Sequence, residues 1–361
     1  MFNSKHYVPI LKWKRAEQGA LKALEEDHKK YITPVIQLVM PKCKLKEKLT
    51  DIIARFKELV SEIPSKVVEV WGVDPVFVDV SLLFTTRLKA ESLKIISQKG
   101  SKLGGTFIPV IHLNDDEEIK NTVYSLVQEN KRGLCLRLIC SDLSDPNKLK
   151  QDIAKLLSSS RLKEKDIDLL VDIKETDKNG DKYVKYLNLT RNISNLASWR
   201  TFIFAAGSFP KDLSECKLDE ENLLPRIDWR SWKEHLSNSK SQRKPAFADY
   251  TIQHPIYKED TQFFPPTSSI KYTLENEWLI MKGKKQKFEL YLASAAALVT
   301  DKRFYGGNFS DGDKYISEKA KHFLIYIKDP AIKGTGSTET WLKAGINHHL
   351  TLVADQIANL P

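Results

Sequence analysis

The chain has 361 residues, of which 41% are apolar and 29% are charged, and its formal net charge is +10 at pH 7. This length and apolar content suffice for a large core in one domain or two, and the cationic surplus favours anionic partners without choosing among them. Four cysteines without a CxxC pair, an N-terminus without an apolar signal segment, and no run of the roughly 18 apolar residues that span a membrane predict a cytoplasmic protein without a membrane partner.

Eight short apolar runs within the first 250 residues predict β-strands, because they are rich in Val, Ile and Phe and are mostly bounded by Gly, Pro, Asp or Asn. These runs begin at Tyr7, Ile32, Val76, Thr106, Gly133, Ile167, Thr201 and Ala246. Segments with the apolar periodicity of amphipathic helices lie between them. The clearest is residues 44–63, where the apolar side chains form one stripe.

Eight strands that each precede a helical segment point to parallel βα units, and eight is the number that closes a barrel. An open, doubly wound sheet is the main alternative, but such a sheet usually carries a glycine fingerprint after its first strand. The stretch LKWKRAEQG in and after the first run has no such fingerprint. We therefore predict a (β/α)8 barrel over residues 1–255.

Residues 256–361 exceed what a minimal barrel needs. The stretch IKYTLENEWLIMKG predicts a hairpin that turns at residues 275–277, FELYLASAAALV predicts the helix that completes the eighth unit, and a last helix is expected over about 338–359. We expect this extension to cover one barrel mouth and to form one cooperative unit with the barrel. Two Gly-rich stretches, GGNFSDGD and GTGST, precede helices and predict either anion-binding sites or N-caps.

Polar residues in several runs are expected to point into the barrel, because strand side chains alternate between the outer helices and the interior. The parity of the apolar neighbours places Asp79, Arg137 and Asp172 inside, and Lys12 shares a face with apolar strand residues. Asp249, an acid within the last apolar run, is expected to join them. We therefore predict a charged site at the carboxyl ends of the strands, where barrel enzymes keep their sites, with Asp249, Lys12, Arg137 and Asp172 as candidate catalytic residues. The alternative is a buried lattice of ion pairs that merely fills the barrel.

Familiar catalytic motifs are absent from the sequence, which contains no P-loop, no GxSxG elbow and no HExxH pair. His348 and His349 are adjacent on the predicted last helix, so their side chains point about 100° apart and are not arranged to bind one metal ion. We expect no metal site, and we expect only one of these histidines to line the barrel mouth near Asp249. The sequence does not identify a cofactor.

Several motifs in a fixed order resemble the phage beta-protein family over essentially the whole chain. They are YVPILKWKRAEQGAL near the start, PAFADYTIQHP, the hairpin end NEWLIMKG, FYGGNFSDGD and the terminal STETWLKAGINHHL. The positions matched by these motifs are Lys12, Glu17, Asp249, Tyr250, Gly312, Asp313, Trp341, His348 and His349. The resemblance implies a cytoplasmic protein of bacterial or bacteriophage origin, and it implies no particular reaction, substrate or catalytic set.

Two hypotheses on function follow. In the first, the charged mouth binds a small anionic ligand, a nucleotide or another phosphate compound, and hydrolyses it by general acid–base chemistry, with Asp249 as the carboxylate and Lys12 or Arg137 holding the anion. The residues expected to bind the ligand are Glu17, Asp79, His112, Tyr250, Asp313, His348 and His349. In the second, the barrel is a non-catalytic scaffold that contacts nucleic acid or a protein partner in phage–host conflict. Steep salt dependence of nucleic-acid binding would favour the second hypothesis. The oligomeric state is left open by the sequence.

Overall fold

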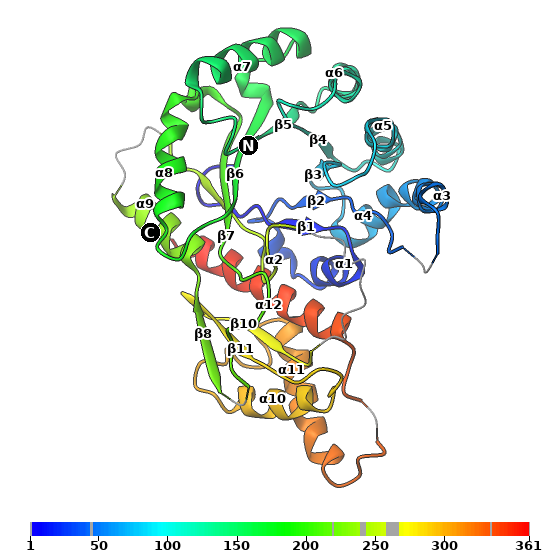
Figure 1. The fold of residues 1–361 in the computed structure, drawn as a ribbon, viewed down its shortest axis with the longest axis vertical. Coiled ribbons are helices and arrows are strands. Elements are labelled where there is room, and N and C mark those ends of the chain that lie inside the picture. The colour runs from blue at the N-terminus through cyan, green and yellow to red at the C-terminus, as the bar shows by residue number, and fades with distance from the viewer. Residues whose placement is uncertain are drawn as a thin grey trace.

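Eight parallel strands form the body of the computed structural model, which describes residues 2–43, 46–218, 220–238, 243–257, 267–332 and 334–360. Their order in the sheet follows the order of the chain, and each strand lies parallel to its neighbours (Figure 1). The strands are β1 (Ile10–Lys12), β2 (Val35–Gln37), β3 (Val76–Asp79), β4 (Phe107–Ile111), β5 (Leu134–Ile139), β6 (Ile167–Glu175), β7 (Thr201–Gly207) and β9 (Ala246–Ala248). Each begins within one of the runs predicted from the sequence.

The first and last strands are also joined, so the sheet closes on itself. The backbone N–H of Val8 donates to the carbonyl oxygen of Phe247 at 2.8 Å, and that of Ile10 donates to the carbonyl oxygen of Asp249 at 2.8 Å. Tyr7 forms a parallel bridge with Phe247. These bonds, together with the strand order, confirm the predicted (β/α)8 barrel.

Helices follow the strands on the outside of the barrel (Figure 1). They are α1 (Arg15–Lys22), α2 (Glu26–Lys29), α3 (Leu49–Val60), α4 (Ile63–Trp71), α5 (Thr86–Lys102), α6 (Glu117–Asn130), α7 (Pro146–Ser160), α8 (Asp181–Leu189) and α9 (Ile227–Asn238). The apolar stripe over residues 44–63 is divided between α3 and α4, because Pro64 has no N–H with which to continue the α3 hydrogen-bond ladder. Residues 44 and 45 lie outside the described residues.

The two faces of the barrel strands belong to two separate apolar cores. Outward-facing side chains such as Leu11, Val78 and Phe247 pack against the helices. The inward-facing side chains fill the barrel and are Val8, Ile10, Val35, Phe77, Ile108, Val110, Cys135, Leu170, Ile203, Ala205, Ala246, Ala248 and Tyr250. This alternation decides which polar side chains reach the interior.

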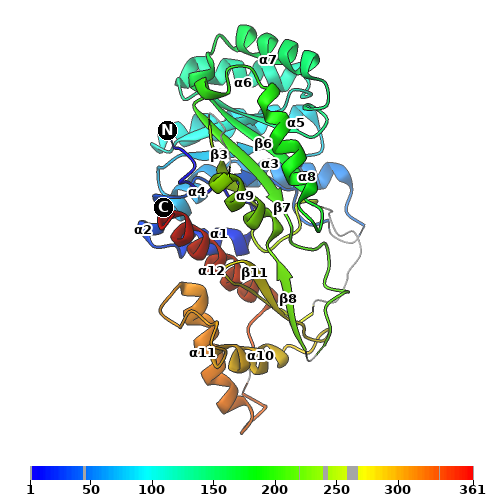
Figure 2. The ribbon, with the colours of Figure 1, turned by 90° about the vertical axis from the view of Figure 1, so that its left-hand side faces the viewer.

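A smaller unit stands beside the barrel (Figures 1 and 2). Its antiparallel sheet contains β10 (Ile270–Thr273), β11 (Glu277–Met281) and β8 (Glu221–Pro225), and its helices are α10 (Leu290–Val299) and α11 (Asp311–Tyr326). The hairpin of β10 and β11 matches the one predicted from the sequence. The third strand, β8, comes from the connection between β7 and α9 and was not predicted.

The last helix, α12 (Thr338–Ala358), joins the smaller unit to the barrel. Its side chains Ile346, Leu350 and Val353 belong to the same core as the outward face of the strands. The helix contacts α1 on the barrel side, and it contacts β10 and α11 on the other side. It therefore lies along the flank of the barrel, where an eighth barrel helix belongs, rather than across a mouth. α10, which was expected to complete the barrel, packs instead within the smaller unit.

Both Gly-rich stretches are followed by helices that carry serine N-caps. The hydroxyl of Ser310 accepts the backbone N–H of Asp313 in the first turn of α11, and that of Ser337 accepts the backbone N–H of Thr340 in α12. These bonds satisfy helix N–H groups that would otherwise lack partners. The N-cap alternative therefore accounts for both stretches.

Candidate functional site

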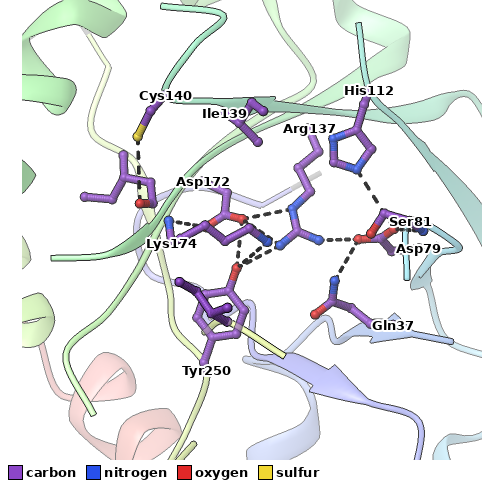
Figure 3. Close-up of polar contacts among 12 residues, drawn as sticks. Gln37, Asp79, Ser81, His112, Arg137, Ile139, Cys140, Asp172, Lys174 and Tyr250 are labelled. Atoms are coloured by element: carbon purple, nitrogen blue, oxygen red, sulfur yellow. Dashed lines mark hydrogen bonds and ion pairs between the residues drawn. The ribbon is translucent and has the colours of Figure 1, made fainter. Parts of the chain in front are cut away.

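Charged side chains converge inside the barrel near the carboxyl ends of its strands (Figure 3). Lys12 and Asp79 are the last residues of β1 and β3, and Arg137 and Asp172 lie near the ends of β5 and β6. All four side chains are buried. We refer to these residues and their polar neighbours as the mouth cluster, which comprises Lys12, Gln37, Asp79, His112, Arg137, Asp172, Lys174 and Tyr250.

Arg137 connects two carboxylates across the interior. Its Nε and Nη2 atoms donate to Asp172 Oδ2 at 3.1 and 2.6 Å, and its Nη1 atom donates to Asp79 Oδ2. Burial alone would raise the pKa of Asp79, but the Arg137 guanidinium holds this pKa well below its ordinary value. Arg137 and Lys174 likewise outweigh burial and lower the pKa of Asp172. The charge of Arg137 is thus compensated, and this part of the cluster has the arrangement of the ion-pair lattice.

Tyr250 and Lys174 extend the cluster towards solvent. The Tyr250 hydroxyl donates to Asp172 Oδ2 at 2.8 Å and accepts from Lys174 Nζ at 3.2 Å. Lys174 lies within an irregularity in the pairing of β6 with β7, and its φ of 61° lies in the left-handed region that lysine seldom adopts. The Lys174 side chain is 37% exposed, so its ammonium links the buried cluster to the surface.

Lys12 differs from the other cations of the cluster in its partners. Its Nζ donates to the carbonyl oxygen of His254 at 3.0 Å, and no described carboxylate lies within ion-pairing distance. Lys12 is only 4% exposed, and burial lowers its pKa to about 8, although the charge of Glu17 opposes this shift. Lys12 is therefore a buried ammonium without a paired carboxylate.

Two more candidate residues lie at this end of the barrel, and both have a buried polar atom that lacks a described hydrogen-bond partner. His112 Nε2 is 3.9 Å from Asp79 Oδ1, which is too long for a hydrogen bond. Glu17 Oε1 accepts from Gln253 Nε2 at 2.8 Å, whereas Glu17 Oε2 has no described partner. Burial raises the pKa of Glu17.

Asp249 does not belong to the mouth cluster, which corrects the expectation that it converges with Arg137 and Asp172. It lies on the outward face of the barrel wall, where its Oδ1 accepts from the Tyr7 hydroxyl at 2.6 Å and its Oδ2 is 2.8 Å from His349 Nε2. The residue that points inward is its neighbour Tyr250. The physical reason is the period of two, because Ala246 and Ala248 face the interior and Asp249 must then face outward.

His348, His349 and Asp313 also lie away from the mouth, contrary to their expected role as ligand-binding residues there. His349 is buried between β9 and β10, with Nδ1 3.0 Å from Thr273 Oγ1, and burial lowers its pKa. His348 lies within the smaller unit, where Nδ1 is 2.7 Å from Asp313 Oδ2 and Nε2 is 2.7 Å from the Thr273 carbonyl oxygen. The two rings thus have different carboxylate partners, as their separation around the helix requires.

Sequence reasoning missed several residues of the mouth cluster and of the buried contacts around Asp249 and Glu17. Lys174 lies two residues after Asp172, so strand alternation predicts the same inward face, but it was not chosen as a site residue. Tyr7 and Gln253 gave no signal, since their partners are distant in sequence. Gln37 could have been found from the alternation of β2, because Val35 faces the interior two residues earlier. Its Nε2 donates to Asp79 Oδ2 at 3.1 Å.

Within the part of the chain that the structure describes, no group of three or more His, Cys, Asp or Glu side chains is arranged to hold a metal ion. In the same residues, none of the helices combines the length and the apolar character needed to cross a membrane.

The geometry defines a (β/α)8-barrel protein with a charged mouth cluster and a smaller α/β unit attached to its flank. The model of the Beta protein family matches residues 7–355, so the chain belongs to that family, which confirms the resemblance seen in the sequence motifs. A search of curated proteins finds no significant match.

Two solved structures are similar to the chain at low identity. A type I 3-dehydroquinate dehydratase from Clostridium difficile, with covalently modified comenic acid, has 10% identity and a TM-score of 0.39, and the match covers 69% of this chain and 85% of that chain. The tryptophan synthase α2β2 complex from Pyrococcus furiosus has 9% identity and a TM-score of 0.27, with 70% and 90% covered. Both likenesses are too distant to bear on function.

Proposed function

We propose that the barrel mouth binds a small anionic ligand, a nucleotide or another phosphate compound, with Lys12 and Lys174 as its cationic anchors. The observation that carries this proposal is the unpaired charge of Lys12. Arg137 contacts two carboxylates and Lys174 contacts one, whereas Lys12 is buried with a carbonyl oxygen as its hydrogen-bond acceptor. A bound anion would supply the missing counter-charge and offset the cost of burying this ammonium.

The positions of the two lysines suit a shared anion. Lys12 Nζ is 5.6 Å from the centroid of the Tyr250 ring and Lys174 Nζ is 5.5 Å from it, so the two ammonium groups lie near the same aromatic side chain. Lysine binds phosphate as a compact point charge and needs no fixed fork geometry. Because Lys174 is partly exposed, an anion would approach the cluster from the end at which Lys174 lies.

Hydrolysis of the bound compound would require a different base from the one expected. Asp249 lies outside the barrel wall, and the carboxylates of Asp79 and Asp172 are engaged by Arg137. We assign the role of general base to His112, because its Nε2 has no described hydrogen-bond partner. A His112→Gln variant should therefore retain anion binding and lose turnover.

A cytoplasmic location and a bacteriophage or bacterial origin are part of the same proposal. The thiols of Cys135, Cys140 and Cys216 are free, which supports a reducing compartment. The support for a bacteriophage or bacterial origin is the set of sequence motifs that this chain shares with the family.

Isothermal titration with inorganic phosphate, pyrophosphate and AMP tests the anion site. We expect at least one of these anions to bind the wild type and to lose tenfold or more in affinity in Lys12→Met and in Lys174→Met, since a hydrogen bond to a charged group contributes about 1.5–3 kcal/mol. Lys150→Met is the matched control, because Lys150 is an exposed lysine on α7, on the outside of the barrel. Equal affinity in Lys12→Met and the wild type, or no binding of any of the three anions, would contradict the proposal.

A further inference from the structure

A cavity of about 1070 Å³ lies beside the mouth cluster, between α1, the α3–α4 pair and the beginning of α12. Its wall combines apolar and charged residues and includes three aromatic side chains. The main apolar residues are Trp13, Met40, Phe56, Ile63, Tyr257 and Leu342. A volume of this size, with apolar and aromatic groups beside polar and charged ones, is typical of sites for small molecules.

Glu17 supplies the buried polar group of this cavity. The residue lines the cavity and is only 1% exposed. Gln253 Nε2 donates to Oε1 at 2.8 Å, but Oε2 is buried without a described partner. A buried carboxylate oxygen without a donor is costly, and the carboxyl group can turn towards the cavity because the terminal torsion of glutamate is soft. The cavity therefore has one unmet acceptor.

The aromatic side chains of the cavity indicate the shape of a ligand that could donate to Glu17 Oε2. Trp13 is 9% exposed and Tyr257 is partly buried, and the Lys14 ammonium lies 4.5 Å from the centroid of the Tyr257 ring. Flat aromatic walls favour planar ligands, and stacking of a base on an aromatic side chain is worth about 1–3 kcal/mol. Charges at the rim are balanced, as in the Arg15–Glu339 pair, so they do not select for strongly charged compounds.

We propose that this cavity binds a planar heteroaromatic ligand of the nucleobase class, which stacks on Trp13 or Tyr257 and donates an N–H to Glu17 Oε2. The site is separate from the proposed anion site, because Lys12 and Lys174 do not line the cavity. Each proposal can therefore fail without the other.

Glu17→Gln tests the polarity of the contact. The amide oxygen of the new side chain would keep the bond from Gln253, and its NH2 group would take the place of Oε2. A ligand donor would then meet another donor. We expect the affinity for N–H-bearing bases to fall at least tenfold, because a hydrogen bond to a charged acceptor is lost and two donors are opposed. Glu62→Gln is the control, since Glu62 lines the same cavity but is exposed.

The probes are adenosine, guanosine, cytidine and uridine, compared by equilibrium dialysis with caffeine, a purine base whose N–H groups are methylated. We expect at least one nucleoside to bind at least tenfold more tightly than caffeine. Trp13→Leu should weaken that nucleoside at least fivefold, whereas Phe84→Leu, which removes a 46% exposed aromatic side chain elsewhere, should leave it unchanged.

The same variants separate the two sites. Trp13→Leu should retain the affinity for inorganic phosphate and pyrophosphate measured at the mouth, and Lys174→Met should retain nucleoside affinity. Thermal melts confirm that each variant is folded. The cavity proposal is overturned if no nucleoside binds the wild type with a Kd below about 1 mM, or if binding is equal in the wild type, Glu17→Gln and Trp13→Leu.

Discussion

Replacing Lys12 by methionine should make the protein more stable at neutral pH. Lys12 is 4% exposed and has one described hydrogen bond, from Nζ to the His254 carbonyl oxygen. Methionine has a similar linear side chain and no charge, so it fills the space of the lysine stem and removes the unpaired ammonium. This result would be unusual for a buried polar residue, whose replacement commonly destabilises the fold.

The size of the effect follows from the pKa of Lys12, which burial lowers from 10.5 to about 8. The unfolded chain holds more protons than the folded protein between these two values, so the charge destabilises the fold by about 3 kcal/mol below pH 8 and by less as the pH rises towards 10.5. Loss of the bond to His254 costs about 1 kcal/mol. The net gain of Lys12→Met should be about 2 kcal/mol at pH 7, and it should nearly vanish at pH 9.5.

Urea titrations of both proteins at pH 7 and at pH 9.5 measure this difference without phosphate in the buffer. Lys14→Met is the control, because Lys14 is adjacent but only partly buried, and we expect a change within about 0.5 kcal/mol. A Lys12→Met protein that is less stable than the wild type at pH 7 would refute the reasoning, since the ammonium would then have a counter-charge that the structure does not show.

Three further outcomes are expected. Asp249→Asn should lower the free energy of unfolding by about 1–3 kcal/mol in urea titrations, because its amide keeps an acceptor for the Tyr7 hydroxyl but no longer offers one to His349, and unchanged stability would contradict this. His6, whose pKa burial lowers to about 3, gains a proton on unfolding below pH 6.5, so it destabilises the fold by about 2 kcal/mol at pH 5. Between pH 7 and 5 the stability of His6→Gln should thus fall by about 2 kcal/mol less than that of the wild type. Parallel pH profiles of the two proteins would exclude this contribution of His6. Ser337→Ala should cost about 1 kcal/mol by removing the N-cap of α12, with an unchanged melting temperature as the contrary result.

The barrel could be predicted from the sequence because its strands are buried on both faces. Runs such as Leu134–Ile139 and Ile167–Glu175 are dominated by residues that favour strands, and loops with turn residues separate them. β8 could not be found in this way. Its residues alternate between exposed and partly buried positions and end in proline, so its pairing with β11 depends on backbone hydrogen bonds more than on apolar burial.

The composition of the mouth cluster was only partly predictable. Asp79, Arg137 and Asp172 lie inside because large apolar neighbours fix the parity of their strands. In the last strand the inward positions before Asp249 are Ala246 and Ala248, small residues that fit either face, so the apolar pattern does not decide the side of Asp249. Lys174 depends on a backbone irregularity that follows from the pairing of β6 with β7, which is a tertiary property.

Asp249 and Tyr250 lie on opposite faces of the barrel wall, and this gives the flanking unit a role at the mouth. Asp249 is held from outside by His349 of α12 and by the Tyr7 hydroxyl. Its neighbour Tyr250 points inward, where its hydroxyl contacts Arg137 at 2.8 Å and its ring lies near both Lys12 and Lys174. Because the two residues share a peptide bond, the contacts of α12 with Asp249 also restrict where Tyr250 can lie. The extension thus supports the mouth from the flank of the barrel, and the acid in the last strand is explained by that support rather than by catalysis.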